Sequence, residues 1–274
     1  MYYGRSYGRG RSGCGGRLIY AAIIAAVSLI SYFGSRQTNT VTGKTQYIDV
    51  TPQQEIALGL QATPDMEAQF NGEDPSQADQ VRVDQVGSTV VANSPASRTP
   101  YQYDFHLLAD DQTVNAFALP GGQVFITRAL YDKLQTEGEL AGVLGHEIGH
   151  VVARHSAEQI AKAQLTQGLT GAAVLATYDP NNPSSTGTAQ VAALIGQLVT
   201  LKFSRTDELE ADGLGVCFMN DAGYDPNEMI NVQEILASLS QGNEPPEYLS
   251  THPSSANRIQ LIQQQLQNIS SCPQ

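Results

Sequence analysis

The feature that most constrains the fold of this chain is the run HEIGH at residues 146–150. In an α-helix, residues four apart lie on the same face, so the imidazoles of His146 and His150 can reach one metal ion. Glu147 lies about 100° further round the helix, within reach of a water molecule beside that ion. Two histidines at this spacing with a glutamate between them are typical of hydrolytic zinc sites. The run therefore predicts a helix with two metal ligands and a general base.

A catalytic zinc site needs a third protein ligand, and the candidates lie in the run SRTDELEAD at residues 204–212. In a helix, Glu208 and Asp212 share a face, whereas Glu210 lies about 200° from Glu208 and points away. Glu208 is therefore the predicted third ligand. Asp212 is expected to accept the free N–H of a ligating histidine and fix its orientation. The alternative is a solvated acidic helix start, which the helix dipole favours.

Together, HEIGHVVARH and SRTDELEAD resemble the gluzincin metallopeptidase family that includes the HtpX-type and CAAX-prenyl-protease-type enzymes. The resemblance covers about residues 50–268. It implies one zinc ion per chain, held by the two histidines of HExxH and the first glutamate of ExxxD, which are His146, His150 and Glu208. Multi-pass members have several membrane helices. This chain has one long apolar run, so it is more similar to the exported, single-domain relatives.

The resemblance also assigns roles to two other segments. NAFALPGG at residues 115–122 resembles the family segment in which an edge strand binds the substrate backbone. The substrate-binding residues that it implies are Asn115, Ala116, Phe117 and Ala118. THPSSANRI at residues 251–259 resembles the C-terminal HP…R element. Its His252 lies near the metal in relatives, some of which use it as a regulatory ligand or as a catalytic transition-state donor. A structural loop histidine is the alternative.

The rest of the chain predicts one α+β domain over residues 51–274, mostly helical and zincin-like, with a small sheet. Thr136 and Glu139 form a capping box that starts the HEIGH helix. Pro120-Gly-Gly predicts a hairpin between the last two strands. Helices are expected at about 51–60, 77–93, 204–221, 226–240 and 255–268, with the HEIGH helix starting at Thr136, and strands at 101–108, 114–119 and 123–127. The small apolar pieces in residues 164–201 are too short to cross a membrane and predict buried helices around a loop.

Residues 18–34 contain no charged side chain and predict a transmembrane signal anchor. As a helix this run spans about 25 Å, just short of a hydrocarbon core of about 30 Å. Residues 1–17 are expected to form a basic disordered tail, and residues 35–50 a polar linker. The arginines before the apolar run predict a cytoplasmic N-terminus and an extracytoplasmic domain, periplasmic in a Gram-negative cell. The alternative is a cleaved signal peptide that leaves a soluble, secreted or periplasmic domain.

The charge distribution bears on the partners. Residues 1–36 hold five of the 15 basic residues and no acidic residue, which leaves 10 basic against 27 acidic residues in the remainder, a formal net charge of −17. Such a domain repels nucleic acid, so no nucleic-acid partner is expected. The Arg-Gly-Tyr-rich tail at 1–17 leaves RNA binding as an alternative. The expected partners are polypeptide substrates and, through residues 18–34, a membrane.

Helix geometry predicts where two further side chains point, and the expected compartment bears on a possible disulfide. His155 lies half a turn round from His146 in a continuous helix, so it is predicted to face away from the metal. Cys217 lies half a turn round from Glu208 and is excluded as a ligand by the same argument. If the domain is exported, Cys217 and Cys272 can form a disulfide, with two free thiols as the alternative.

These inferences predict a membrane-anchored zinc endopeptidase that hydrolyses unfolded or misassembled proteins outside the cytoplasm. Glu147 is the expected general base, and an edge strand would bind substrate through backbone hydrogen bonds with little side-chain selectivity. The alternative function is a membrane-tethered chaperone or assembly factor whose protease is latent.

Overall fold

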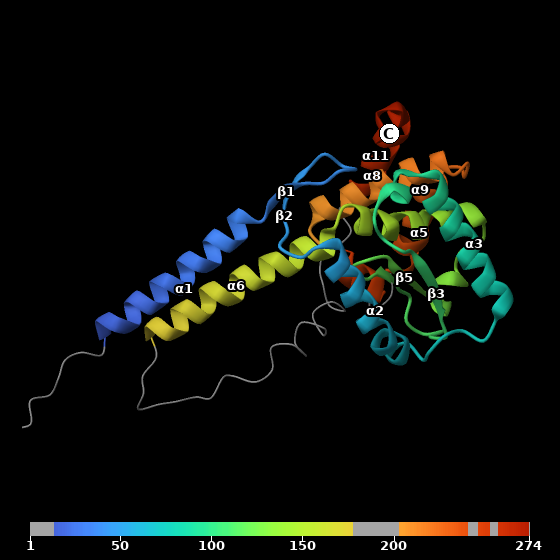
Figure 1. Cartoon of the computed structure of the whole chain (residues 1–274). Helices are drawn as coiled ribbons and strands as arrows, with labels where there is room; N and C mark the ends of the chain where they lie inside the picture. Colours follow the sequence, from blue (N-terminus) through green and yellow to red (C-terminus); the bar gives the residue numbers. More distant parts are fainter. Residues whose placement is uncertain (1–13, 178–202, 241–245, 253–256, 274) are drawn as a thin grey trace, which may run out of the picture.

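The computed structural model describes residues 14–177, 203–240, 246–252 and 257–273 (Figure 1). Most of these residues are helical and the strands form two small sheets, which confirms the α+β class. Most of the predicted basic tail, and residues 178–201 of the predicted apolar helices, lie outside the described ranges.

The elements agree closely with the predicted ones in the middle of the chain. In order, they are α1 (Cys14–Gly34), β1 (Arg36–Thr38), β2 (Thr45–Tyr47), α2 (Pro52–Gln69), α3 (Gln77–Asn93), β3 (Asp104–Leu108), β4 (Ala116–Ala118), β5 (Gln123–Thr127), α4 (Arg128–Tyr131), α5 (Glu137–Val152), α6 (His155–Thr177), α8 (Arg205–Asp221), α9 (Glu228–Leu239), α10 (Glu247–Thr251) and α11 (Arg258–Gln267). The predicted capping box is present, with Thr136 Oγ1 accepting from the Glu139 amide at 3.0 Å. The α2 helix continues through Pro64, nine residues beyond its predicted end at Leu60.

The larger sheet has the strand order β3–β5–β4, which leaves β4 at an edge of this sheet. β3 and β5 are parallel, whereas β4 and β5 are antiparallel, with Phe117 opposite Phe125. Gly121 and Gly122 have φ angles of 88° and 109°, which glycine tolerates and other residues rarely adopt. They form the tight turn between β4 and β5, so the predicted hairpin is confirmed.

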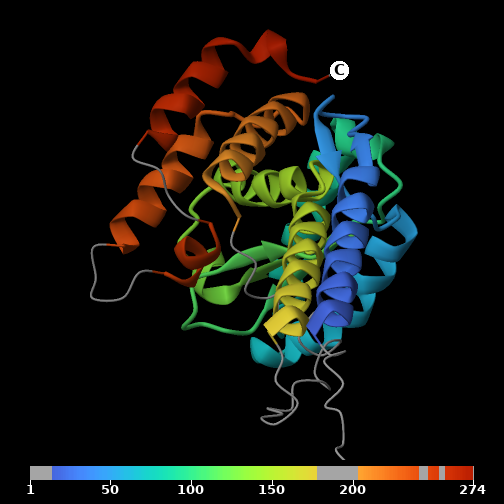
Figure 2. The same ribbon diagram turned by 90° about the vertical axis from the view of Figure 1, so that its left-hand side faces the viewer.

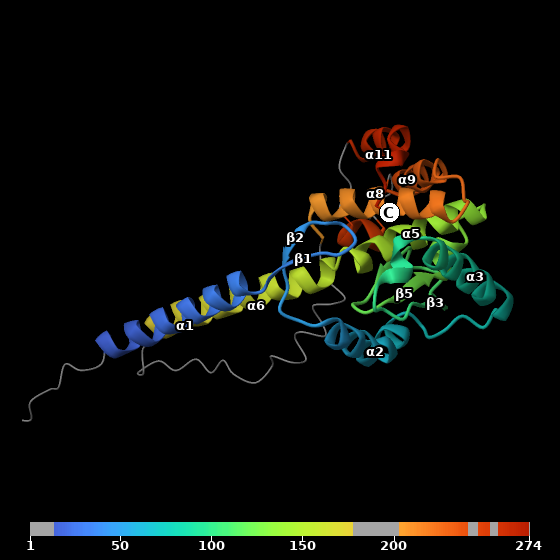
Figure 3. The same cartoon turned by 45° about the horizontal axis from the view of Figure 1, so that its top comes forward.

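Side chains that alternate along the strands fill two cores on opposite faces of this sheet. Val124 and Ile126 of β5 belong to the main core with α3 and α5, whereas Phe125 packs in a second core with Phe70 at the end of α2. The α8 and α9 helices contact α5 on its other side, as Figure 3 shows. Every residue of α5 from 139 to 152 is therefore buried, and the HEIGH helix is the centre of the domain.

The α1 and α6 helices lie side by side as an antiparallel pair that extends away from the rest of the molecule (Figures 1 and 2). Ala157 and Ala161 at the start of α6 are buried, but residues 164–169 are half-buried or exposed. The prediction of a buried helix is wrong for residues 164–169, because α6 leaves the main core there and contacts α1 instead.

The helix α1 contains the apolar run that was predicted to cross a membrane. It exposes large apolar side chains, among them Leu18, Ile19, Ile23, Val27, Ile30 and Phe33. No helix in the described part of the chain combines the length and the apolar content that a membrane span requires. The predicted transmembrane helix is therefore not confirmed.

Residues 35–50, predicted as a polar linker, contain the antiparallel strands β1 and β2, and two side chains of this segment reach the end of α5. Asn39 donates from Nδ2 to the carbonyl oxygen of Val152 at 2.8 Å, and Gln46 donates from Nε2 to the carbonyl oxygen of Ala153. The last carbonyl groups of a helix have no hydrogen-bond donor within the helix, and these two side-chain amides donate to two of them. The segment thus holds the C-terminal end of the HEIGH helix.

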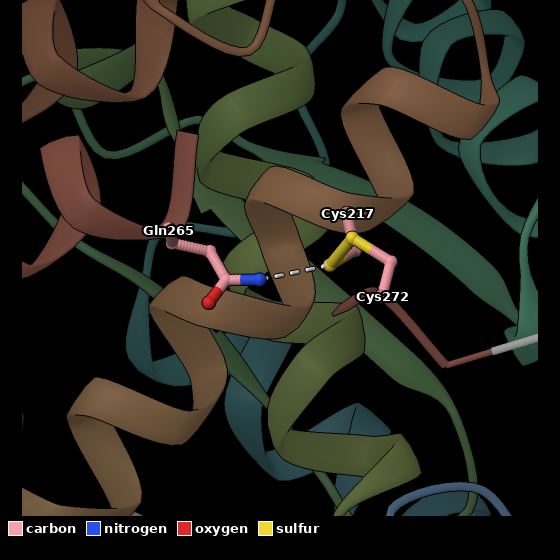
Figure 4. The surroundings of a disulfide bond; sticks show 3 residues. All are labelled: Cys217, Gln265 and Cys272. Carbon is pink, nitrogen blue, oxygen red and sulfur yellow. Dashed lines mark hydrogen bonds between the residues drawn. A yellow bond between two sulfur atoms is a disulfide. The ribbon is translucent and has the colours of Figure 1, made fainter. Parts of the chain in front are cut away.

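A disulfide joins Cys217 of α8 to Cys272, so the structure has the predicted bridge in place of two free thiols (Figure 4). The two Cα atoms are 5.5 Å apart, an ordinary separation for a disulfide. Gln265 of α11 donates from Nε2 to Cys217 Sγ at 3.5 Å. The bridge therefore ties the chain after α11 to α8, the helix that carries Glu208 and Asp212.

Candidate metal centre

Glycines let the two site-bearing helices, α5 and α8, approach backbone to backbone. A Cβ atom at Gly149 would lie 3.0 Å from the carbonyl oxygen of Ala211, and one at Gly215 would lie 3.1 Å from the amide nitrogen of His146. Both distances are tighter than normal carbon contacts, so larger residues would separate the helices. This close approach brings the acidic side chains of α8 to the histidines of α5.

The structure brings four of the predicted site residues together in one buried cluster, His146, His150, Glu208 and His252, and one potential ligand atom of each lies within 4.8 Å of the others. His146 Nε2 lies 3.1 Å from His150 Nε2 and 3.6 Å from a carboxylate oxygen of Glu208. Glu208 Oε1 lies 3.4 Å from His150 Nε2 and 3.0 Å from His252 Nδ1. None of the four is more than 2% exposed.

The donor set of this cluster fits zinc, which prefers imidazole nitrogen and carboxylate oxygen as ligands. The second general feature of a hydrolytic site is a free base beside the metal. Both carboxylate oxygens of Glu147 are buried and lack a hydrogen-bond partner among the described residues. A buried carboxylate without hydrogen bonds is costly, so its retention beside the cluster indicates a role in chemistry.

Asp212 lies where the sequence placed it, with Oδ1 accepting from His146 Nδ1 at 3.0 Å. Arg258 of α11 donates from Nε and Nη2 to the two oxygens of Asp212, at 2.5 and 2.8 Å, and its Nη1 lies 3.1 Å from Glu208 Oε2. Burial raises the pKa of Asp212, but the charge and hydrogen bonds of Arg258 outweigh it, so this pKa lies below its usual value. An ionised Asp212 holds the Nδ1–H of His146 and leaves Nε2 for the metal.

Glu147 and His252 face each other, with His252 Nε2 3.6 Å from Glu147 Oε1. Burial raises the pKa of Glu147, and the nearby charges of His252 and His146 offset this only in part. Burial lowers the pKa of His252, but the carboxylates of Glu208 and Glu147 outweigh it, and the net pKa is raised. A carboxyl group with a raised pKa suits proton transfer near neutral pH.

His155 is not one of the four clustered residues, in line with the prediction that it faces away from the metal, but it packs against one of them. His155 is 1% exposed, and its Nδ1 lies 2.8 Å from Nδ1 of His150. The prediction assumed one continuous helix from His146 to His155. Instead α5 ends at Val152, Arg154 adopts a left-handed φ of 58°, and α6 starts in a new direction at His155. Arginine rarely adopts a positive φ angle, so nothing in the sequence signalled a break in the helix at this position.

Three of the four predicted substrate-binding residues form the edge strand β4, which packs against α5, and the fourth, Asn115, directly precedes it. The buried ones are Asn115 and Ala116, and the half-buried ones are Phe117 and Ala118. The amide of Tyr248 donates to the carbonyl oxygen of Val114 at 3.2 Å, and its ring stacks on His252 with 4.4 Å between ring centroids. Tyr248 therefore connects the start of the edge strand to the metal cluster.

Arg258 and Tyr248 were not predicted as site residues. Arg258 is in the THPSSANRI run and is the only charged residue there, which in retrospect is its signal. Tyr248 had none, because an aromatic residue in a short helix is typical of a core position.

The fold and the buried cluster together define a metal site of the HExxH peptidase class. The chain belongs to Peptidase family M48, whose family model matches residues 77–266. Peptidases of this family depend on zinc, and the cluster of His146, His150, Glu208 and His252 fits that ion.

Several curated relatives share this region. The beta-barrel assembly-enhancing protease of Yersinia pestis is 37% identical over 183 residues, 65% of this chain and 37% of that protein. The mitochondrial metalloendopeptidases OMA1 of Arabidopsis thaliana and Schizosaccharomyces pombe are 38% and 37% identical over 158 and 166 residues, which cover 58% and 60% of this chain and 30% and 47% of theirs. The chain thus matches less than half the length of these relatives. They confirm a metallopeptidase family and do not establish the HtpX-type or CAAX-type subgroup.

Proposed function

We propose that this chain is a zinc-dependent endopeptidase that hydrolyses unfolded or misassembled proteins at a membrane surface. The observation that carries the proposal is the fully buried carboxylate of Glu147, which accepts no hydrogen bond from the described residues and lies beside the cluster of His146, His150 and Glu208. The relatives named as proteases and metalloendopeptidases support peptide-bond hydrolysis. The beta-barrel assembly-enhancing proteases support a role in protein quality control.

In this proposal, His146, His150 and Glu208 hold the zinc, which when bound supplies the Lewis acidity that lowers the pKa of water and polarises a carbonyl group. Glu147 accepts the proton of the attacking water and delivers it to the leaving amine. Asp212 keeps the Nδ1–H of His146 engaged, so that Nε2 stays available to the metal.

His252 acts as a gate in the same proposal. A catalytic zinc keeps one position open for water or substrate, yet His252 Nδ1 lies within 3.0 Å of Glu208 and 3.3 Å of His146 Nε2. His252 stands beside the three other donors and, with zinc bound, would compete with water or substrate for that open position. It has to withdraw before substrate enters, which makes this a closed form of the enzyme.

The outer edge of β4, which pairs with no further strand among the described residues, is the proposed binding site for substrate. An extended chain added to this edge would bond to the backbone at Ala116 and Ala118, and side chains would contribute little. Such binding favours chains without stable structure, because a folded protein rarely offers a free strand.

We further propose that the domain lies outside the cytoplasm and is attached to a membrane through α1. The exposed apolar side chains of α1 and the arginines before it support attachment and this orientation. The disulfide between Cys217 and Cys272 supports an oxidising compartment. A C-terminal reporter fusion that is active only outside the cytoplasm is the expected result. A reporter active only inside it would reverse the proposed orientation.

Cleavage of an unfolded substrate tests the function. The zinc-loaded full chain and its His252→Ala variant are incubated with casein, and with a tightly folded protein as control. We expect casein to be cleaved, faster by the variant because its gate is absent, and the folded protein to stay intact. If both forms bind casein without cutting it, the latent chaperone or assembly factor replaces the peptidase.

A further inference from the structure

A chain of three polar side chains lies behind the metal ligand His150. His155 Nδ1 is 2.8 Å from His150 Nδ1, and His155 Nε2 is 3.4 Å from a carboxylate oxygen of Glu210. Lys44 Nζ lies 2.9 Å from the same oxygen of Glu210. The three residues come from the start of α6, from α8, and from the segment between β1 and β2. They meet only in the folded protein.

The direction in which His150 points determines which ring nitrogens of His150 and His155 carry a hydrogen atom. His150 Nε2 faces the cluster, 3.4 Å from Glu208, so its lone pair is the one available to a metal and its hydrogen is on Nδ1. The Nδ1–H then donates to Nδ1 of His155, which must accept. His155 therefore carries its hydrogen on Nε2, where the carboxylate of Glu210 accepts it.

We propose that His155 is a positioning residue for the zinc ligand His150, and that Glu210 and Lys44 hold His155 in the tautomer that this task needs. The proposal rests on the proposed zinc site and extends it to residues that do not touch the metal. In this proposal both ligating histidines of α5 have a side chain that accepts a hydrogen bond from their Nδ1–H group. A carboxylate, Asp212, holds His146 directly, whereas His150 is held by an imidazole with a carboxylate behind it.

The environment of the chain supports this assignment. His155 is 1% exposed, and the side chain of Glu210 is 11% exposed, so water competes little for either hydrogen bond. Glu210 Oε2 lies within reach of both His155 Nε2, at 3.4 Å, and Lys44 Nζ, at 2.9 Å, so this one carboxylate oxygen can accept from both. Lys44 belongs to the β1–β2 segment, so the region before the family-matched residues contributes to the metal site.

Two substitutions separate positioning from packing. His155→Asn keeps a carbonyl oxygen close to the place of the imidazole Nδ1 but removes the ring. His155→Phe keeps a ring of similar size but removes the acceptor. If His155 positions His150, asparagine is the better replacement for zinc binding. If His155 only fills space in the core, phenylalanine is the better replacement.

The test measures the zinc affinity of the full chain by competition with a chromogenic chelator, together with the thermal midpoint. We expect His155→Phe to weaken zinc binding about 10–100-fold and His155→Asn to lie clearly closer to the unaltered chain. Lys162→Ala, on the surface of α6, is the matched control and should change nothing. Equal losses in both variants, or unaltered affinity in His155→Phe, would overturn the proposal.

Glu210→Ala keeps the proposal testable if a His155 variant does not fold, because its side chain lies nearer the surface. We expect it to weaken zinc binding several-fold, since His155 then loses the acceptor that fixes its tautomer, while unchanged affinity counts against the proposal. An unaltered chain that binds no zinc would contradict the proposed function itself, whereas a zinc-binding chain indifferent to these substitutions would contradict only the positioning role.

Discussion

Single hydrogen bonds orient the donor atoms at the centre of this molecule. Asp212 accepts from His146, and the guanidinium of Arg258 in turn fixes both oxygens of Asp212. Because Arg258 also lies against Glu208, one buried cation serves two carboxylates of the site. The position of α11 therefore matters for the metal, although α11 carries no potential ligand.

Replacing Asp212 by asparagine tests this arrangement. Asp212→Asn keeps the shape of the side chain but removes the charge that Arg258 neutralises and weakens the acceptor for His146. We expect zinc affinity to fall about 10–100-fold, as measured by chelator competition. Asp221→Asn, at the exposed end of the same helix, is the control. A variant at Asp212 with unaltered zinc affinity would show that the aspartate does not orient the ligand.

Site residues could be predicted from the sequence only where local helix geometry determines their positions. Spacing within a regular helix fixes which residues share a face. This placed His146, Glu147 and His150 relative to one another in one helix, and Glu208 and Asp212 in another. The role of His155 could not be predicted, since it depends on the left-handed turn between α5 and α6, which tertiary bonds hold in place. The meeting of these helices with Arg258 and Tyr248 is likewise a product of packing between distant segments.

At the scale of elements, the contact between α5 and α8 sets the spacing of the site. The sequence predicted both helices, but it did not predict that glycines of each helix lie at their contact. Gly149 and Gly215 lie at the contact, whereas a Cβ atom at Gly213 on α8 would meet nothing within 4 Å. Gly149 and Gly215 are therefore required for the close approach of the helices, whereas Gly213 is not.

We predict that Gly149→Ala destabilises the protein by about 1–3 kcal/mol, because the new methyl group meets the backbone of α8 and the helices have to separate. Gly213→Ala is the matched control and should stabilise the protein by up to about 1 kcal/mol through helix propensity. Denaturant unfolding of the zinc-free forms measures both. Similar effects of the two substitutions would mean that the contact tolerates extra volume.

A second contact between elements predicts a pH dependence. Arg128 of α4 donates to both oxygens of Asp74, which lies between α2 and α3, at 2.6 and 2.9 Å. These hydrogen bonds hold the pKa of Asp74 below its usual value. Because the folded-state pKa is the lower one, the stabilisation is complete above about pH 4 and is lost as the pH falls through the folded-state pKa.

Asp74→Asn should therefore cost about 1.5–3 kcal/mol at pH 7, the range for hydrogen bonds to charged groups. The difference from the unaltered chain should shrink as the pH is lowered below 4, because Asp74 then becomes neutral in both states. Unfolding free energies at a series of pH values measure this difference. A difference that stays constant with pH would exclude an ionised Asp74 as its source.

For the whole molecule, the HEIGH helix is the common support of every part. The larger sheet and α3 pack against it on one side and α8 and α9 on another, while Asn39 and Gln46 of the β1–β2 segment hold its C-terminal end. The order of helices and strands in the family-matched region followed from turn residues, caps and periodicity. The pairing of α1 with α6 did not, because an apolar run such as residues 18–34 does not by itself specify which segment it packs against.

The central claim is that a zinc ion held by this cluster and the carboxylate of Glu147 together hydrolyse peptide bonds. The most direct measurement compares the zinc content and the casein cleavage rate of the chain with those of Glu147→Gln. The account predicts equal zinc content in both, and a rate lower by about 10²–10⁴-fold in the variant, because glutamine keeps the shape but cannot accept the proton. Cleavage at the unaltered rate by the zinc-loaded Glu147→Gln chain would contradict the account.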